Sequence, residues 1–171
     1  EGPRVSAAAP GDGPGPRVIA IGERAPDFTL PDQDRKDWTL STALRSGPVV
    51  LCFYPFDFSS VCGSEMGCVR DWAGRWRGTG AQAVGISCDS TYAHRAWARE
   101  LGLEHPLLAD AHRVVCRAYG LYWAERNVAA RGTVVVAPDG LVAWSEGRAP
   151  GCAMDMATVL ERLEQARGGG R

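Results

Sequence analysis

The sequence predicts an α/β fold in which a central mixed β-sheet is flanked by helices. The apolar run 49–54 ends at Pro55, and apolar residues then recur at helical spacing. A second apolar run, 81–88, follows that helix, so we expect a right-handed crossover between two parallel, buried strands. The Pro-Asp-Gly tripeptide 138–140 separates two more apolar runs, which is a strong β-hairpin signal.

The other elements follow in chain order from periodicity and turn residues. The expected elements are strands over 28–30 and 38–40, a brief helix capped by Ser41, the strand 49–54, a helix with Cys62 in its first turn, the strand 81–88, a helix over 91–101, a strand over 107–109, a helix over about 111–118, hairpin strands over 132–137 and 141–144, and a last helix over about 153–166. A βαβ unit followed by a hairpin and a helix is the thioredoxin-like arrangement, with an insertion between its halves.

Composition is typical of one globular domain with a small-molecule substrate. We expect a single domain over 19–167, between a disordered Gly/Pro-rich tail over 1–18 and a flexible tail over 168–171. The 19 basic and 20 acidic residues are interspersed, which argues against a nucleic-acid or acidic-lipid partner. No apolar stretch is long enough to cross a membrane, and six cysteines are too few for a disulfide scaffold. A cytoplasmic location is the default expectation.

Cys62 is the candidate nucleophile. It falls in the first turn of the predicted helix, where unpaired backbone N–H groups and the helix dipole stabilise an anion, so its thiol should ionise more easily than a free one. Pro55 ends the preceding strand, Ser59 offers a hydroxyl three residues before the cysteine, and Glu65 lies one turn after it. We also expect solvent to reach the sulfur.

The spacing of Pro55, Ser59 and Cys62 resembles the peroxiredoxin signature P-x-x-x-T/S-x-x-C. The resemblance extends through APDFTL, PLLAD, AYGLY and ARGTVVV, and covers residues 20 to about 166. It is strongest with the AhpE-like branch of the alkyl hydroperoxide reductase and thiol-specific antioxidant superfamily. The resemblance implies a thioredoxin-like fold with the peroxiredoxin insertion, and a homodimer.

Two charged residues and one glycine are interpreted through this resemblance. Arg131 resembles the active-site arginine before the late strand, although alone it would be interpreted as a solvated charge at a strand edge. Glu65 resembles the acidic residue that follows the peroxidatic cysteine, and it either orients Arg131 or is only a partner of the helix dipole. Gly63 departs from the family, where Thr usually follows the cysteine, and either eases unwinding of the first turn or loosens the site.

The implied activity is that of a thiol-dependent peroxidase. Cys62 would attack hydrogen peroxide or an organic hydroperoxide and become a sulfenic acid, with Ser59 and Arg131 activating the peroxide and Pro55 shielding the thiolate. A thioredoxin-like or mycoredoxin-like protein, or a low-molecular-weight thiol, would reduce the enzyme again. No metal, haem or flavin is implied.

The cysteine that would resolve the sulfenic acid is left open. Cys152, at the expected start of the last helix, and Cys68, six residues after Cys62, are equal candidates, and Cys88 ranks third. A one-cysteine mechanism with an external thiol is as well supported as any of them. Cys68 would need local unfolding, because six helical residues separate the two sulfurs by about 9 Å of rise.

Two other cysteines are interpreted as packing residues. Cys52 lies inside the central apolar strand, and Cys116 follows His112 at a spacing that provides only half of a metal site.

Two other functions remain open. A thiol-disulfide oxidoreductase on the same fold would need Cys-x-x-Cys, but this chain has Ser59-x-x-Cys62. A peroxiredoxin-like protein used for another sulfur reaction or for binding gains support from Gly63 and from the unusual set of cysteines.

Overall fold

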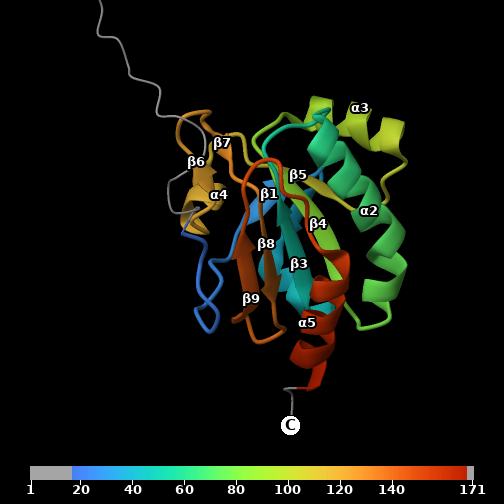
Figure 1. Cartoon of the computed structure of the whole chain (residues 1–171), viewed down its shortest axis with the longest axis vertical. Coiled ribbons are helices and arrows are strands. Elements are labelled where there is room, and N and C mark those ends of the chain that lie inside the picture. Colours follow the sequence, from blue (N-terminus) through green and yellow to red (C-terminus); the bar gives the residue numbers. More distant parts are fainter. Residues whose placement is uncertain (1–16, 169–171) are drawn as a thin grey trace, which may run out of the picture.

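The computed structural model describes residues 17–168. Its centre is a five-stranded sheet with the strand order β5-β4-β3-β8-β9 (Figure 1). The strand bounds are β3 Val49–Phe53, β4 Gln82–Ser87, β5 Leu107–Ala109, β8 Gly132–Val136 and β9 Val142–Gly147. Strand β3 runs parallel to β4 and antiparallel to β8, which confirms a mixed sheet.

Helices and two small hairpins surround this sheet. The helices are α1 Leu40–Ala43, the 3₁₀-helix η1 Leu44–Ser46, α2 Ser60–Arg77, α3 Thr91–Leu101, α4 Val114–Ala118 and α5 Met156–Gly168. The small antiparallel pairs are β1 Thr29–Pro31 with β2 Asp37–Thr39, and β6 Tyr122–Trp123 with β7 Val128–Ala129.

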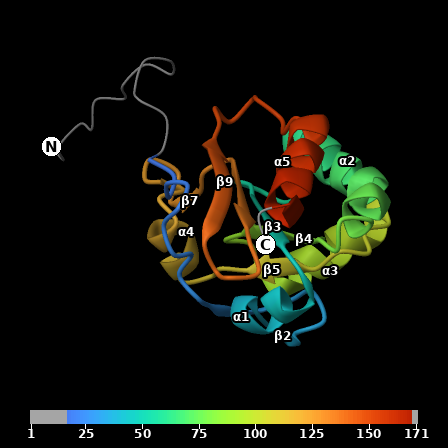
Figure 2. The same cartoon turned by 90° about the horizontal axis from the view of Figure 1, so that it is seen from below.

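The sheet separates two apolar clusters, because successive side chains of a strand point to opposite faces. In β3, Leu51 and Phe53 belong to one cluster, and Val50 and Cys52 belong to the other. Figure 2 shows α2 and α5 together on one side of the sheet and α4 on the other. The α4-side cluster contains, among others, Val84, Ile86, Val115, Cys116 and Tyr119. The α2-side cluster contains, among others, Cys62, Met66, Trp76, Trp97 and Val159.

Two helices begin three residues later than the sequence predicts. Helix α4 begins at Val114 because Arg113 has a left-handed conformation with φ of 58°. Helix α5 begins at Met156, where the carboxylate of Asp155 accepts the backbone N–H groups of Ala157 and Thr158. This carboxylate caps the helix, so Cys152 lies in the preceding turn rather than at the helix start.

Two further details differ from the expectation at the N-terminal half and in the insertion. Ser41 does not cap a helix but lies inside α1, where its backbone N–H donates to Asp27 at 2.9 Å. The β6–β7 hairpin was not predicted, because strands of two residues have no periodicity to detect.

Within residues 17–168, no helix has the length and apolar character to span a bilayer. Residues 1–16 and 169–171, which include most of both expected tails, lie outside the described residues.

Candidate active site

Cys62 is the third residue of α2, directly after the loop that follows the buried strand β3. Ser59 precedes the helix in an extended conformation, and its Oγ accepts the backbone N–H of Cys62 at 3.4 Å. The Ser59 carbonyl oxygen accepts the N–H of Gly63 at 2.8 Å, which closes the first helical turn. Ser59 is therefore the N-cap, and because its oxygen accepts through a lone pair, its hydroxyl proton remains able to donate.

A buried polar network fixes the loop between β3 and α2. The Tyr54 hydroxyl donates to one carboxylate oxygen of Asp57 at 2.7 Å, and His94 Nδ1 lies 2.6 Å from the other. His94 Nε2 lies 3.1 Å from the carbonyl oxygen of Leu108, which can only accept, so Nε2 carries a hydrogen. One further proton is consequently held between Asp57 and His94. Neither Asp57 nor His94 was predicted to have a role from the sequence, yet both anchor the loop that leads to Ser59.

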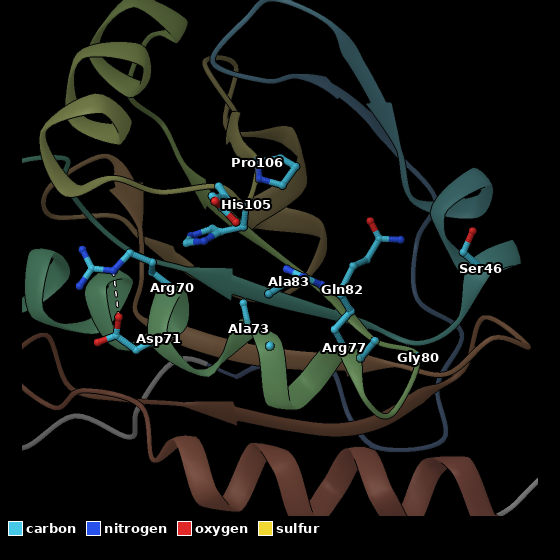
Figure 3. Close-up of a pocket in the computed structure, with 13 residues that line it drawn as sticks. Ser46, Arg70, Asp71, Ala73, Arg77, Gly80, Gln82, Ala83, His105 and Pro106 are labelled. Atoms are coloured by element: carbon cyan, nitrogen blue, oxygen red, sulfur yellow. Dashed lines mark hydrogen bonds and ion pairs between the residues drawn. The ribbon is translucent and has the colours of Figure 1, made fainter.

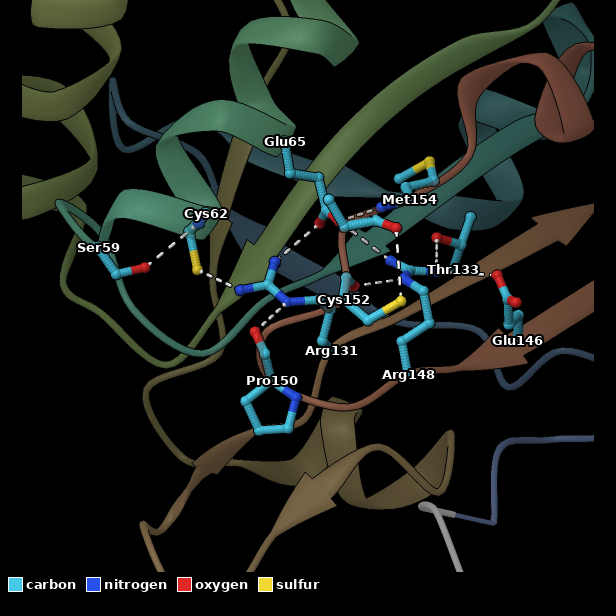
Figure 4. A network of polar contacts seen from close by, with 11 residues as sticks. Ser59, Cys62, Glu65, Arg131, Thr133, Glu146, Arg148, Pro150, Cys152 and Met154 are labelled. Carbon is cyan, nitrogen blue, oxygen red and sulfur yellow. Dashed lines mark hydrogen bonds and ion pairs between the residues drawn. The ribbon is translucent and has the colours of Figure 1, made fainter. Parts of the chain in front are cut away.

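Arg131 directly precedes β8, and the alternation of side chains places it with Thr133 and Val135 on the α2 side of the sheet. Its Nη2 lies 3.0 Å from the Sγ of Cys62 (Figure 4). Its Nε donates to the carbonyl oxygen of Pro150 at 2.9 Å. With only 2% of its side chain exposed, Arg131 is not a solvated charge at a strand edge.

Glu65 links the site to two arginines. Its Oε1 lies 3.2 Å from Arg131 Nη1, and its Oε2 lies 3.2 Å from Arg148 Nη2. The backbone N–H of Met154 also donates to Oε2 at 2.8 Å. The Glu65 side chain is fully buried, so these contacts replace the water that an ionised carboxylate would otherwise bind. Of the two interpretations of Glu65, the geometry matches the one in which it orients Arg131.

Arg148 is a site residue that was not predicted from the sequence. It follows β9 directly, and its Nη1 contacts Thr133 Oγ1 at 2.9 Å and Glu146 at 3.3 Å. Counting outward from the 138–140 turn would pair position 131 with position 147, one residue short, because the register shifts between Val135 and Val136. The observed register, with Gly132 opposite Gly147, brings both arginines to one end of the hairpin.

The buried charges beside the sulfur do not cancel. Two guanidiniums, of Arg131 and Arg148, face the single buried carboxylate of Glu65, so these three side chains carry a net positive charge. The next carboxylate, of Glu146, is 44% exposed, and solvent screens it more strongly. An anion on Cys62, in contact with Arg131, would balance the remaining positive charge.

Cys62 itself has no exposed surface, contrary to the expectation that solvent reaches its sulfur. Pro55 is buried, as a shielding residue should be, and Arg131 occupies the space beside the sulfur. The turn over 150–152 is held against the site, because Arg131 donates to the Pro150 carbonyl oxygen and Arg148 Nε donates to that of Cys152 at 3.2 Å (Figure 4). A peroxide can reach Cys62 only when part of this cover moves.

The three resolving candidates lie in different surroundings. Cys68 is exposed on α2, and Cys152 is exposed in the turn before α5. Cys88 packs against the α4-side cluster, whereas Cys62 belongs to the α2-side cluster, so Cys88 does not approach the active face. The sheet lies between them, which removes the basis for Cys88 as a resolving residue.

A cavity of about 660 Å³ lies apart from these residues (Figure 3). Its lining includes Arg70, Arg77, Gln82 and His105, and none of the site residues predicted from the sequence. We therefore place the candidate active site at Cys62 and not in the cavity.

Comparison with known proteins agrees with this geometry. The model of the AhpC/TSA family matches residues 21–145. Alkyl hydroperoxide reductase E of Mycobacterium tuberculosis is 34% identical over 148 residues, which cover 85% of this chain and 97% of that relative. The crystal structure of peroxidoxin BcpB from M. tuberculosis superposes with a TM-score of 0.77 at 30% identity, covering 88% of this chain and 98% of that one. Enterococcus faecalis AhpC gives a TM-score of 0.80 at 25% identity, covering 86% and 92%.

Proposed function

This chain belongs to the AhpC/TSA family, in the AhpE-like branch of the peroxiredoxins, and from that premise we propose that it reduces peroxides with the thiol of Cys62. The observation that carries the proposal is the 3.0 Å contact between Arg131 Nη2 and Cys62 Sγ at the start of α2. A fixed guanidinium beside the sulfur supports two things at once: a negative charge on the nucleophile, and hydrogen bonds to an approaching oxygen.

The reaction proceeds in one displacement. The Cys62 thiolate attacks one oxygen of the peroxide, so an S–O bond forms while the O–O bond breaks. The leaving oxygen takes a proton and departs as water or an alcohol, and the sulfur is left as a sulfenic acid. Arg131 and the free proton of the Ser59 hydroxyl are the donors placed to stabilise the charge on the leaving oxygen.

Access of peroxide requires a local opening. The cover over Cys62 consists of the loop that contains Pro55 and Ser59, and of the turn over 150–152 that the two arginines hold. Neither segment belongs to the central sheet. We propose that these two segments move to admit the substrate, and that Glu65 keeps the arginines in place while they do so.

Regeneration requires a thiol. Cys68 is exposed on the helix that carries Cys62, and Cys152 is exposed in the turn that Arg148 holds, so either could resolve the sulfenic acid if its segment moved. An external thiol is the alternative: a thioredoxin-like or mycoredoxin-like protein, or a low-molecular-weight thiol. We propose a cytoplasmic location, where such reductants keep thiols reduced.

We also propose that residues 19–167 form a single domain and that the protein is a homodimer. Phe56 and Phe58 are exposed on the loop that precedes α2, and large exposed aromatic side chains are common at subunit interfaces. Sedimentation of the reduced protein tests this part by itself.

Stopped-flow consumption of hydrogen peroxide by reduced protein tests the activity. The wild type should react, Cys62→Ser should lose the reaction, and Cys68→Ser, which removes an exposed thiol of the same helix, should keep it. Equal rates for wild type and Cys62→Ser would contradict the proposal. Disulfide exchange that depends on Cys62, without peroxide consumption, would favour a thiol-disulfide oxidoreductase instead.

A further inference from the structure

Two cysteines that the proposed peroxidase reaction does not use lie together on the α4 side of the sheet. Cys88 follows β4 and Asp110 follows β5, and these parallel strands pair with Ser87 opposite Ala109. Cys88 and Asp110 are therefore neighbours at the carboxyl ends of the two strands. Cys116 reaches the same point from α4, so the two sulfurs and a carboxylate oxygen of Asp110 all lie within 4.8 Å of one another.

Asp110 holds α4 in this position. Its two carboxylate oxygens accept the backbone N–H groups of Val115 at 3.2 Å and of Cys116 at 2.8 Å. The Cys116 sulfur lies 3.5 Å from the carbonyl oxygen of Arg113, so its one thiol hydrogen points either to that oxygen or to the Cys88 sulfur. The side chain of Cys116 is fully buried, whereas Cys88 is only half-buried. Cys88 is thus the more exposed residue of the two.

The two thiols also differ in chemistry. A hydrogen bond from the Cys116 thiol lowers the pKa of Cys88, against the effects of burial and of the Asp110 carboxylate, and the backbone N–H of Ala129 acts in the same direction. The same hydrogen bond to Cys88, together with burial, raises the pKa of Cys116. Cys88 consequently loses its proton more readily than Cys116 does. A partly exposed thiolate beside a second cysteine is typical of oxidisable dithiols.

We propose that Cys88 and Cys116 form a second redox centre, which peroxide converts to a disulfide without the help of Cys62. In the first step the Cys88 sulfur attacks a peroxide oxygen, an S–O bond forms, the O–O bond breaks, and water or an alcohol leaves after taking a proton. In the second step the Cys116 sulfur attacks Cys88, an S–S bond forms, and the hydroxyl of the sulfenic acid leaves as water with the Cys116 proton. Two thiols are oxidised and one peroxide is reduced.

A bound metal ion is the competing use of the same three side chains. Two sulfurs and one carboxylate oxygen are ligands that Zn²⁺ accepts. However, both oxygens of Asp110 already accept backbone N–H groups, and within residues 17–168 no fourth His, Cys, Asp or Glu joins the group. His112, whose spacing from Cys116 suggested half of a metal site, is exposed and outside it. We therefore favour the dithiol and treat the metal as an outcome of the test.

The test uses the full chain with Cys62→Ser, so that the proposed peroxidatic thiol is absent. The reduced protein is treated with a small excess of hydrogen peroxide, free thiols are blocked, and tryptic peptides are mapped by mass without reduction. Cys88 lies in the tryptic peptide 78–95 and Cys116 in the peptide 114–117, so their disulfide joins two separate peptides. We expect this linked pair, with the loss of two hydrogen atoms, and its disappearance after reduction.

Controls separate this centre from other thiols. Adding Cys68→Ser, which removes an exposed cysteine on α2, should leave the link unchanged. Cys116→Ser should instead trap a sulfenic acid on Cys88 that dimedone labels, and the linkage assay does not depend on whether this variant folds. The proposal is overturned if Cys88 stays reduced, if it is oxidised further without joining Cys116, if it joins another cysteine, or if the isolated protein contains one metal ion per chain that protects both thiols.

The two proposals can fail separately. Loss of peroxide turnover in Cys62→Ser tests the peroxidase, whereas the peptide link in that same variant tests the second centre. A chain without peroxidase activity can still form the link, and an active peroxidase can lack it.

Discussion

The backbone N–H of Arg148 donates to the carbonyl oxygen of Arg131 at 2.8 Å, so the two arginines lie opposite each other where the β8–β9 hairpin ends. Two cations in such register repel each other unless an anion lies between them. Glu65 supplies that anion from α2, with one oxygen for each guanidinium. These ion pairs connect α2 to the β8–β9 hairpin, and Nη2 of Arg131 contacts the Cys62 sulfur.

The two arginines should differ in their effect on activity. Arg131→Lys keeps the positive charge but loses the planar guanidinium, whose three nitrogens contact Cys62, Glu65 and the Pro150 carbonyl oxygen at the same time. We therefore expect the rate constant for the reaction with peroxide to fall about 10²-fold. Arg148→Lys is the matched control, because Arg148 contacts Glu65 and not the sulfur, and its loss should be clearly smaller. Stopped-flow rates measure both, and equal losses would contradict a direct role for Arg131.

Glu65 should matter for stability as well as for activity. Glu65→Gln leaves the buried Arg131 without a carboxylate and Arg148 with only the partly exposed Glu146, so we expect the free energy of unfolding to fall by about 3–5 kcal/mol. Urea denaturation of reduced protein measures this. Glu161→Gln, at an exposed position of α5, should leave the midpoint unchanged. A Glu65 variant as stable as that control would mean that the ion pairs have no net effect.

Gly63 can be replaced by a larger residue without a clash. A Cβ there would meet only the Trp97 ring, at an ordinary distance of 4.0 Å. Because Gly destabilises a helix, Gly63→Ala should raise the free energy of unfolding by about 0.5–1 kcal/mol. Gly74→Ala, in the same helix with open space around its Cβ, is the control for the general effect. If the first turn of α2 must unwind during turnover, Gly63→Ala should lower the steady-state rate and Gly74→Ala should leave it unchanged.

The cover over Cys62 should make it selective for small oxidants. Cys68 and Cys152 are exposed, so a bulky aromatic disulfide reagent should modify them first and Cys62 slowly. Hydrogen peroxide at one equivalent should instead oxidise Cys62 first. Quenched samples analysed by peptide mass give both orders. Rapid modification of Cys62 by the bulky reagent would show that the site is open in solution.

The core of the fold could be predicted from sequence because its elements are long and periodic. The strand before Cys62, the helix after it and the strand over 82–87 each carry a clear apolar pattern, and α3 and β5 were predicted with their observed bounds. The starts of α4 and α5 depend on local features instead. The left-handed conformation of Arg113 sets the start of α4, and the capping carboxylate of Asp155 sets the start of α5. The spacing of apolar residues reveals neither feature.

The site was only partly predictable for a similar reason. Pairing of Cys62 with Arg131 follows a family pattern, whereas Arg148 requires the hairpin register, and the Asp57–His94 pair requires the packing of α3 on the sheet. Cys88 was retained as the third resolving candidate because its position after the strand does not say which face of the sheet it takes. It lies with Val84 and Ile86, on the face opposite Cys62.

His105 provides a test of stability against pH that is independent of the active site. It lies beside the cavity of Figure 3, is only 7% exposed, and neither ring nitrogen has a hydrogen-bond partner among the described residues. Burial therefore lowers the pKa of His105 to about 4, from an ordinary value near 6.5. The folded protein keeps this ring neutral under conditions in which the unfolded chain protonates it.

The sign of the pH effect follows from this difference. Above about pH 6.5 the His105 ring is neutral in both the folded and the unfolded state, so it does not lower the free energy of unfolding. As the pH falls from about 6.5 to 4, the unfolded state binds a proton that the folded state does not, and the free energy of unfolding decreases by up to about 3 kcal/mol. His105→Leu should remove this part of the pH dependence in urea denaturation, while His112→Gln, at an exposed position, should retain it. Parallel curves for wild type and His105→Leu between pH 4 and 7 would contradict the prediction, because a ring that binds its proton equally in both states cannot shift the unfolding equilibrium.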